Sequence, residues 1–235
     1  MESQYCSHIV YTRKQQNRKQ IFVFRLYPIR EYGILYEDQL FFSRRVQYMT
    51  NPYIECPVWE NDRYCLRLVE DADADDLFLV YSDRNAWPIF NSDNCTSDFR
   101  YTKRQQMAET IAFWREEYRK QYYARWAVTD KETGHAIGTI ELFNRQAQDF
   151  FTDCGLLRLD LRSDYETTAV ITEILGLLLP DAFALFHCRM IATKVPGMAA
   201  ERKKAVEKLG FVPTEELLTG SHTGKTYGEY FILMK

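Results

Sequence analysis

The sequence lacks the patterns that bind metals, nucleic acids or membranes. Its six cysteines form no CxxC pair and its four histidines have no ligand-like spacing, so we expect no metal site. A formal net charge of −3 lacks the basic surplus of a nucleic-acid binder. No apolar run reaches the ~20 residues of a membrane span, and the polar N-terminus has no early apolar stretch typical of a signal peptide. These absences predict a cytoplasmic protein with reduced thiols; a disulfide framework is the alternative.

The charge is distributed unevenly along the chain. Residues 1–48 carry eight Lys/Arg against four Asp/Glu, whereas residues 49–235 carry 22 against 29. We therefore expect an N-terminal extension (1–48) and a main domain (49–235). The extension is open to three interpretations: a small β-rich addition, a nucleic-acid-binding arm, or translated leader upstream of a natural start at Met49.

The main domain alternates between strand and helix patterns. Strands are predicted at 64–70, 124–130, 136–143, 154–161, 188–195 and 227–235, and helices at 71–83, 101–123, 168–186 and 199–211. Gly210 is placed to end the last helix. The apolar segment 174–186 contains Pro180 and Asp181 and is expected to be a core helix. This order predicts an α/β or α+β mixed sheet with helices on its faces.

One strand–turn–helix junction raises a question about ligands. In "DLRSDYETTAVITEIL" (160–175) a strand pattern meets a turn and then a helix pattern, which is the geometry that often holds a phosphate on a helix N-terminus. The turn nevertheless contains no glycine, and it contains Glu166. The junction is either an anion-binding loop or the remnant of one.

Four stretches carry a resemblance to a known family. They are "LRLVEDADADDLFLVYSD", "WAVTDKETGHAIGTIEL", "TEILGLLLPDAF" and "AVEKLGFVPTEE", of which the "EKLGF" ending is the most specific. From Tyr64 to the C-terminus the chain resembles the GNAT acyltransferase superfamily, in its ribosomal-protein-alanine N-acetyltransferase-like branch. The resemblance covers about 170 residues and leaves 1–63 unexplained.

The resemblance implies a GNAT-like fold and an acetyl-CoA donor. The fold has a mixed, mostly antiparallel sheet with one splayed parallel strand pair, here 154–161 and 188–195. Backbone groups of Leu159, Asp160 and Leu161 would pair with the pantetheine arm like an added strand. An amine would then attack the thioester directly, so the enzyme supplies positioning and a proton route.

The cofactor turn departs from the family pattern Q/R-x-x-G-x-G/A. The resemblance places its six slots on Glu166, Thr167, Thr168, Ala169, Val170 and Ile171. All three defining slots differ, and Glu166 would repel a pyrophosphate by on the order of 1 kcal/mol or more. Thr167 and Thr168 offer hydroxyl donors in partial compensation.

The last helix departs as well. The branch's "N-x-x-S" slots fall on Ala199 and Arg202, and its frequent tyrosine falls near Val206. Arg202 is a candidate for the cofactor phosphates, together with Lys203 and Lys204. A solvated basic helix face is the alternative interpretation.

Three residues are catalytic candidates. Glu141 on strand 136–143 can draw a proton from an amine, Asp160 can face the gap, and Tyr230 can donate a proton. For Glu141 the alternative is a surface glutamate on the polar face of its strand.

These patterns predict an N-acetyltransferase that transfers an acetyl group from acetyl-CoA to a primary amine, on a small molecule or a protein N-terminus. The alternatives are a catalytically inactive GNAT-fold binding or regulatory protein, and a protein that uses its groove for another donor or a peptide. A homodimer is left open.

Overall fold

The computed structural model describes residues 12–16, 19–23, 34–35, 51–222 and 224–235. The chain divides into two compact units, Met1–Met49 and Thr50–Lys235. In the first unit, β1 (Thr12–Gln16), β2 (Lys19–Val23) and β3 (Ile34–Leu35) form an antiparallel sheet. That residues 1–48 precede the natural start stays a prediction, as does the domain division built on it.

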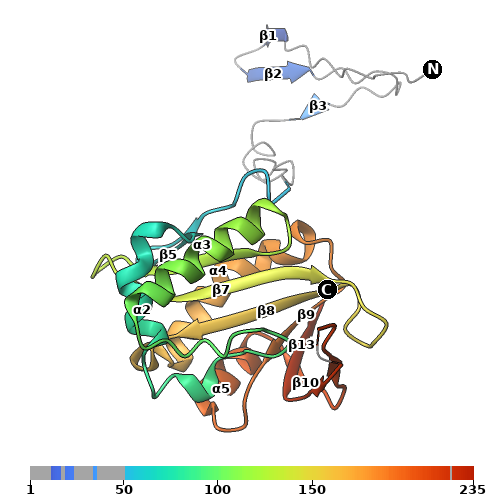
Figure 1. Ribbon diagram of the computed structural model, residues 1–235. Coiled ribbons are helices and arrows are strands. Elements are labelled where there is room, and N and C mark those ends of the chain that lie inside the picture. The colour runs from blue at the N-terminus through green and yellow to red at the C-terminus, as the bar shows by residue number, and fades with distance from the viewer. Residues whose placement is uncertain (1–11, 17–18, 24–33, 36–50, 223) are drawn as a thin grey trace, which may run out of the picture. The chain divides into compact units, whose positions relative to one another are not determined.

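The second unit is built on an eight-stranded sheet (Figure 1). In spatial order its strands are β10 (Val212–Pro213), β13 (Tyr230–Met234), β9 (Met190–Lys194), β8 (Cys154–Leu161), β7 (Ala136–Arg145), β6 (Ala124–Asp130), β5 (Tyr64–Leu68) and β4 (Trp59–Glu60). A separate antiparallel pair joins β11 (Leu218–Thr219) and β12 (Thr226–Tyr227).

Only one neighbouring strand pair in this sheet is parallel. β8 pairs with β9 from Cys154 opposite Met190 to Leu157 opposite Thr193, and the pairing stops there although β8 continues to Leu161. All other neighbouring pairs in the sheet are antiparallel. We call the space beside residues 158–161 of β8, past this last pair, the cofactor gap.

Helices cover both faces of the sheet. α2 (Ala74–Tyr81) and α3 (Arg104–Arg119) share one buried cluster, which includes Leu77, Ile111 and Trp114. α4 (Thr168–Leu185) and α5 (Ala200–Lys208) pack in another cluster with Leu157 and Leu159 of β8. Figure 1 shows α3 in front of the sheet and α4 behind it.

The predicted fold class is confirmed: the sheet is mixed and mostly antiparallel, with one parallel pair and helices on both faces. Gly210 follows α5 with φ +91°, the left-handed conformation that ends helices and favours glycine. α4 is long and apolar enough to cross a membrane by length and composition. In the structure it packs on the sheet with Ile174, Leu175 and Leu178 fully buried, as expected of a core helix.

Three short 3₁₀ turns complete the unit, at Asp71–Asp73, Trp87–Ile89 and Ser163–Tyr165. The first begins α2 with a capping box between Glu70 and Asp73, so the acidic run at 71–76 serves this helix start. The other two flank the cofactor gap: one precedes a buried loop segment, and the last lies between β8 and α4.

Candidate functional site

A cavity of about 940 Å³ opens on the α3 face of the sheet. Seven aromatic side chains contribute to its wall: Phe99, Tyr101, Phe113, Trp114, Tyr122, Tyr123 and Phe143. Polar groups come from Gln106, Glu109 and Glu117 and from the loop residues Ser221 and His222. The volume suits a small ligand, and an aromatic wall combined with polar and charged groups is typical of ligand sites.

The cavity floor is a row of buried charges across three strands. Arg125 of β6 lies opposite Glu141 of β7, and Glu141 lies opposite Arg158 of β8. The two carboxylate oxygens of Glu141 each pair with one arginine, and all three residues are buried. The Arg125 guanidinium lies 4.0 Å from the centre of the Trp114 ring. The two ion pairs with Glu141 and the contact of Arg125 with the Trp114 ring therefore hold these three side chains in place.

The predicted base Glu141 lies on this floor but is not free. Burial opposes its charge, yet Arg125 and Arg158 outweigh burial and hold the pKa of Glu141 below its usual range. A carboxylate held in this way is a weak base. Its role as proton acceptor stays a prediction, while its contacts make it an anchor for the floor.

Asp160, also predicted to be catalytic, lies beyond this row and is completely buried. It accepts hydrogen bonds from the Tyr81 hydroxyl at 3.0 Å and the Asn91 N–H at 3.4 Å. Burial raises the pKa of Asp160, although Arg125 and Arg202 oppose the rise. Asp160 is thus a buried carboxyl held by the Tyr81 hydroxyl, the Asn91 N–H and, at 3.6 Å, the Arg125 guanidinium.

The backbone of β8 presents a free edge to the cofactor gap. The Arg162 N–H donates to Ile137 of β7, and strand alternation then directs the backbone groups of Asp160 to β7 and those of Leu159 and Leu161 to the gap. Within the described residues, Leu159 and Leu161 have no partner in the β8–β9 ladder. Arg158 begins the splayed part of the strand and also lines the cavity, so the cavity borders the gap.

A segment of the loop after α2 crosses the splayed strands. We call residues 89–93 the strap; Phe90, Asn91 and Asp93 in it are buried. Asn91 contacts Asp160, and the Asp93 carbonyl accepts from Arg158 at 3.0 Å. Figure 1 shows this loop passing over β8 toward β9 and β13. The strap thus lies over the gap from the α3 face.

The end of the strap at Asp93 is held by an ion pair with Lys194. Both carboxylate oxygens of Asp93 accept from Lys194, the last residue of β9, at 2.7 Å. The Tyr230 hydroxyl of β13 donates to the same carboxylate at 3.1 Å. Burial, and then Asp93, raise the pKa of Tyr230. Tyr230, the predicted proton donor, therefore contacts the strap in this state, and its catalytic role stays a prediction.

The cofactor turn is occupied by the protein's own acidic side chains. Thr167 caps α4 by accepting from the Val170 N–H. The Thr168 N–H and hydroxyl both donate to Glu201 of α5, at 3.1 and 2.6 Å. Lys204 first, and then Thr168, lower the pKa of Glu201 to about 2. A carboxylate thus already uses the start of α4, where a phosphate is expected in the family.

Glu166 forms a bidentate ion pair at this turn. Arg202 of α5 donates from Nε and Nη2 to its two carboxylate oxygens at 2.6 and 2.7 Å, with side-chain exposures of 1% for Arg202 and 7% for Glu166. Arg202 also donates from Nη1 to the Ile89 carbonyl of the strap at 3.3 Å. The solvated-face interpretation of α5 is wrong for Arg202, while Lys203 and Lys204 are exposed.

The other predicted cofactor residues are divided between surface and core. Ala169 is exposed, whereas Val170 and Ile171 are buried in the cluster beneath α4. The bulk of Ile171 therefore points into the core and not toward a ligand. The cofactor roles of these residues stay predictions.

The family described as acetyltransferase (GNAT) domain matches residues 63–212. The chain belongs to the GNAT acetyltransferase family. A search of curated proteins found no match.

Solved structures of GNAT proteins share the fold. A ribosomal-protein-S5-alanine acetyltransferase from Vibrio fischeri has a TM-score of 0.55 at 16% identity, covering 76% of this chain and 96% of that one. A spermidine N-acetyltransferase from Vibrio cholerae, in complex with CoA and spermine, has a TM-score of 0.54 at 15% identity, covering 74% and 96%. A ribosomal L7/L12 alpha-N-protein acetyltransferase in complex with CoA has a TM-score of 0.55 at 10% identity, covering 76% and 98%.

CoA, which the GNAT family implies, fits one part of this site and not the other. The free edge at Leu159 and Leu161 suits an extended arm. The position expected for the pyrophosphate holds the carboxylates of Glu166 and Glu201, which would repel it. The residues present at this turn therefore do not fit a pyrophosphate unless these carboxylates move.

Sequence reasoning missed the residues that shape both parts of the site. Arg125 and Arg158 each stand within an alternating apolar strand, in "ARWAVTD" and "CGLLRLDL", and that position was the available signal for a buried charge. The strap had no such signal, because its contacts to Arg158 and Lys194 span 65 and 101 residues. In the described part of the chain, no group of His, Cys, Asp and Glu side chains could hold a metal ion.

Proposed function

We propose that this GNAT protein is an N-acetyltransferase that acetylates a primary amine bound in the cavity on the α3 face, with acetyl-CoA as the donor. One observation carries the proposal: Arg158 lines the cavity and is also the first residue of β8 beyond its pairing with β9. An amine in the cavity would therefore lie beside the gap in which this family places the acetyl group.

The cavity lining supports an amine acceptor. Glu109 and Glu117 of α3 contribute negative charge to its wall. Aromatic faces attract a cationic ammonium group, and they pack on an apolar body. The solved relatives are described as acetyltransferases of ribosomal-protein alanine, of a protein α-amino group, and of spermidine, the last in complex with spermine. We therefore infer an amine attached to an apolar or aromatic group small enough for about 940 Å³.

The floor charges would position the amine rather than take its proton directly. Glu141 is held by Arg125 and Arg158, which keep its charge from moving. Asp160 lies nearby with a raised pKa and a hydrogen bond from Tyr81. In this arrangement the chain's own residues orient the acceptor and exclude water, which is the main contribution expected of an enzyme for direct acyl transfer.

The test uses the full chain. Acetyl-CoA is titrated calorimetrically, and acetylation is followed by mass spectrometry over a panel of amines that includes spermine, aromatic amines and short peptides with free N-termini. Binding and a labelled amine product support the proposal. No product from any amine at millimolar acetyl-CoA, with protein shown to be folded, contradicts it.

A second function is favoured by the Glu166–Arg202 ion pair. This pair stands where the GNAT pattern has a ligand-binding turn, as expected of a protein that binds a ligand in its cavity without acyl transfer. In that case amines would raise the thermal midpoint without acetyl-CoA, and CoA would not bind.

A further inference from the structure

The two sites at which the chain departs most from the GNAT pattern contact each other. Glu166 stands in the first slot of the cofactor turn. Arg202 stands in the second defined slot of the "N-x-x-S" pattern, which precedes "EKLGF" in the last helix. They form one bidentate ion pair, in which each charge is almost completely buried. Since a buried charge without its partner is strongly unfavourable, the two departures form one structural unit.

This unit also holds the strap. The third nitrogen of the Arg202 guanidinium, Nη1, donates to the Ile89 carbonyl at the near end of the strap. At the far end, Asp93 contacts Lys194 and its carbonyl accepts from Arg158. Arg202 therefore connects the carboxylate in the cofactor turn to the segment that lies over the splayed strands.

Glu166 offers Arg202 the same contact as a phosphate would. Arginine binds carboxylates and phosphates in the same bidentate way, with two parallel N–H···O bonds. The Nε and Nη2 donors that a phosphate would use are the two donors that Glu166 now occupies. An entering phosphate therefore has to take the place of the Glu166 carboxylate.

We propose that Glu166 is a built-in competitor of CoA: CoA binds when one of its phosphates replaces the Glu166 carboxylate on Arg202. In this exchange Glu166 turns toward solvent. The hydrogen bond from Arg202 to the Ile89 carbonyl is weakened at the same time, so the strap becomes more mobile when CoA binds. The affinity for CoA is thus set by the replacement of the Glu166 carboxylate by a CoA phosphate, and not by a glycine-rich turn. The inference rests on the proposed function, because it takes CoA as the donor.

The experiment is a calorimetric titration of CoA, and separately of inorganic pyrophosphate, into the full chain. Glu166→Gln keeps the shape of the side chain and removes its charge. We expect it to bind CoA at least about tenfold more tightly than the wild type, because a like charge within a few ångströms costs more than a decade in affinity. Pyrophosphate should change in the same direction.

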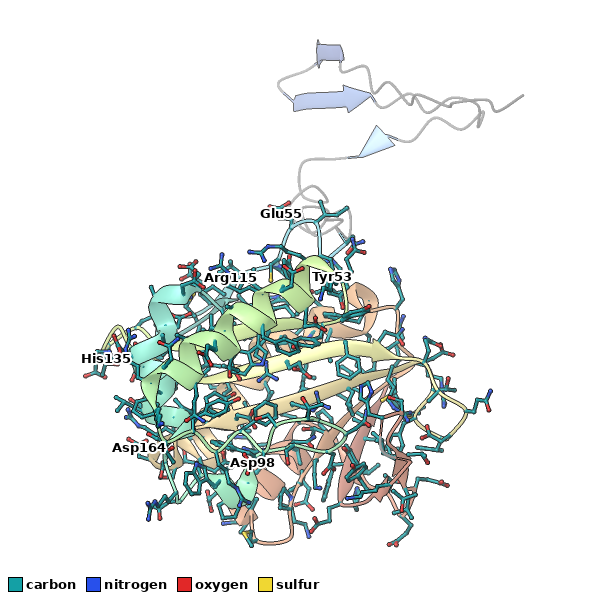
Figure 2. All side chains as sticks on the ribbon, viewed as in Figure 1. Tyr53, Glu55, Asp98, Arg115, His135 and Asp164 are labelled. Carbon is teal, nitrogen blue, oxygen red and sulfur yellow. The ribbon has the colours of Figure 1, made fainter. Side chains whose placement is uncertain are left out.

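The matched control is Asp164→Asn. Asp164 is two residues away in the same turn, pairs with Arg162 and lies at the surface (Figure 2), so its replacement removes an equal charge without freeing Arg202. We expect its CoA affinity to stay within a factor of about three of the wild type, as for a screened surface charge. The double variant Glu166→Gln/Arg202→Gln should lose the gain.

The outcomes separate the inference from the proposed function. Equal or weaker CoA binding by Glu166→Gln overturns the inference and leaves the transferase standing. No CoA binding by either folded protein overturns both. If Glu166→Gln does not fold, Glu166→Asp takes its place, because it withdraws the carboxylate by one methylene; it should show a smaller gain, and no gain overturns the inference.

Discussion

Strand β8 borders a cavity on its α3 face and a gap along the edge where it leaves β9, and the strap lies over this gap. On the cavity side, Glu141 is held between two arginines beneath a cavity of about 940 Å³. On the gap side, Glu166 is paired with a single arginine, and the strap covers the strands. Both sides bury charge, but the side chains leave a cavity on the α3 face, whereas at the turn a carboxylate already occupies the arginine. If the proposals above hold, the acceptor side is preformed and the donor side has to exchange partners.

The substitution with the largest expected effect removes the charged carboxylate from the floor of the cavity. Glu141→Gln leaves the buried guanidinium groups of Arg125 and Arg158 facing each other without their shared carboxylate. We expect a loss of about 3–5 kcal/mol in the free energy of unfolding, measured in urea. Glu109→Gln, an exposed residue of the cavity wall, should change it by less than about 0.5 kcal/mol. A loss under about 1 kcal/mol for Glu141→Gln would show that the floor is not held by this carboxylate.

The second-largest effect is expected from a substitution that weakens the attachment of the strap to β9. Asp93→Asn weakens the contacts with Lys194 and Tyr230, which are charge-assisted hydrogen bonds worth about 2 kcal/mol together. Backbone amide hydrogen exchange in residues 89–93 should speed up, while exchange in α4 stays unchanged. Unchanged exchange in the strap would mean that its other contacts suffice to hold it.

A smaller effect is expected from a substitution that fills the cavity and tests whether the cavity and the cofactor gap bind their ligands independently. Thr110 of α3 lines the cavity, so Thr110→Trp should raise the KM for the amine at least about tenfold, equivalent to ~1.4 kcal/mol of acceptor binding. The affinity for CoA should not change. Gln105→Trp, on an exposed part of the same helix, is the control. A parallel loss of CoA affinity would mean that the two sides are one site.

The smallest effect concerns the start of α4. The folded-state pKa of Glu201 is lowered to about 2 by Lys204 and Thr168. A depressed carboxyl pKa stabilises the fold above the unfolded pKa, about 4.3, and that stabilisation is lost as pH falls toward 2. The difference in thermal midpoint between wild type and Glu201→Gln should therefore be present at pH 6 and shrink below about pH 4. A difference that stays constant down to pH 2.5 would contradict this assignment.

The order of elements could be predicted from the sequence because it depends on local patterns. Alternating apolar residues marked the strands around Leu157 and Ile140, and Gly210 marked the end of α5. The predicted final strand at 227–235 is shorter, Tyr230–Met234: Tyr227 pairs in β12, and Glu229 has a positive φ of 64° that interrupts extended backbone. The short strands β4 and β10 were missed, because two residues carry no periodicity.

The candidate site was predicted only in part. Glu166 and Arg202 were named from their slots in the family pattern, and Glu141 and Asp160 from their places on predicted strands, but their partners were not predicted. Glu141 was weighed as a base or a surface residue, and in the structure it is a buried ion-pair partner. Whether a strand residue is exposed depends on what packs over the sheet, and alternation alone does not reveal that.

By itself the sequence determined the order of strands and helices, which follows from residue periodicity, and its resemblance to the GNAT family supplied the splayed pair and the departures from the GNAT turn. Only the tertiary structure decided that Glu166 and Arg202 are partners, that the strap lies over β8, and that Glu141 is shared by two arginines. Ion pairs form between groups brought close in space. Residues 36 positions apart, such as Glu166 and Arg202, meet only once helices α4 and α5 have packed together on the sheet.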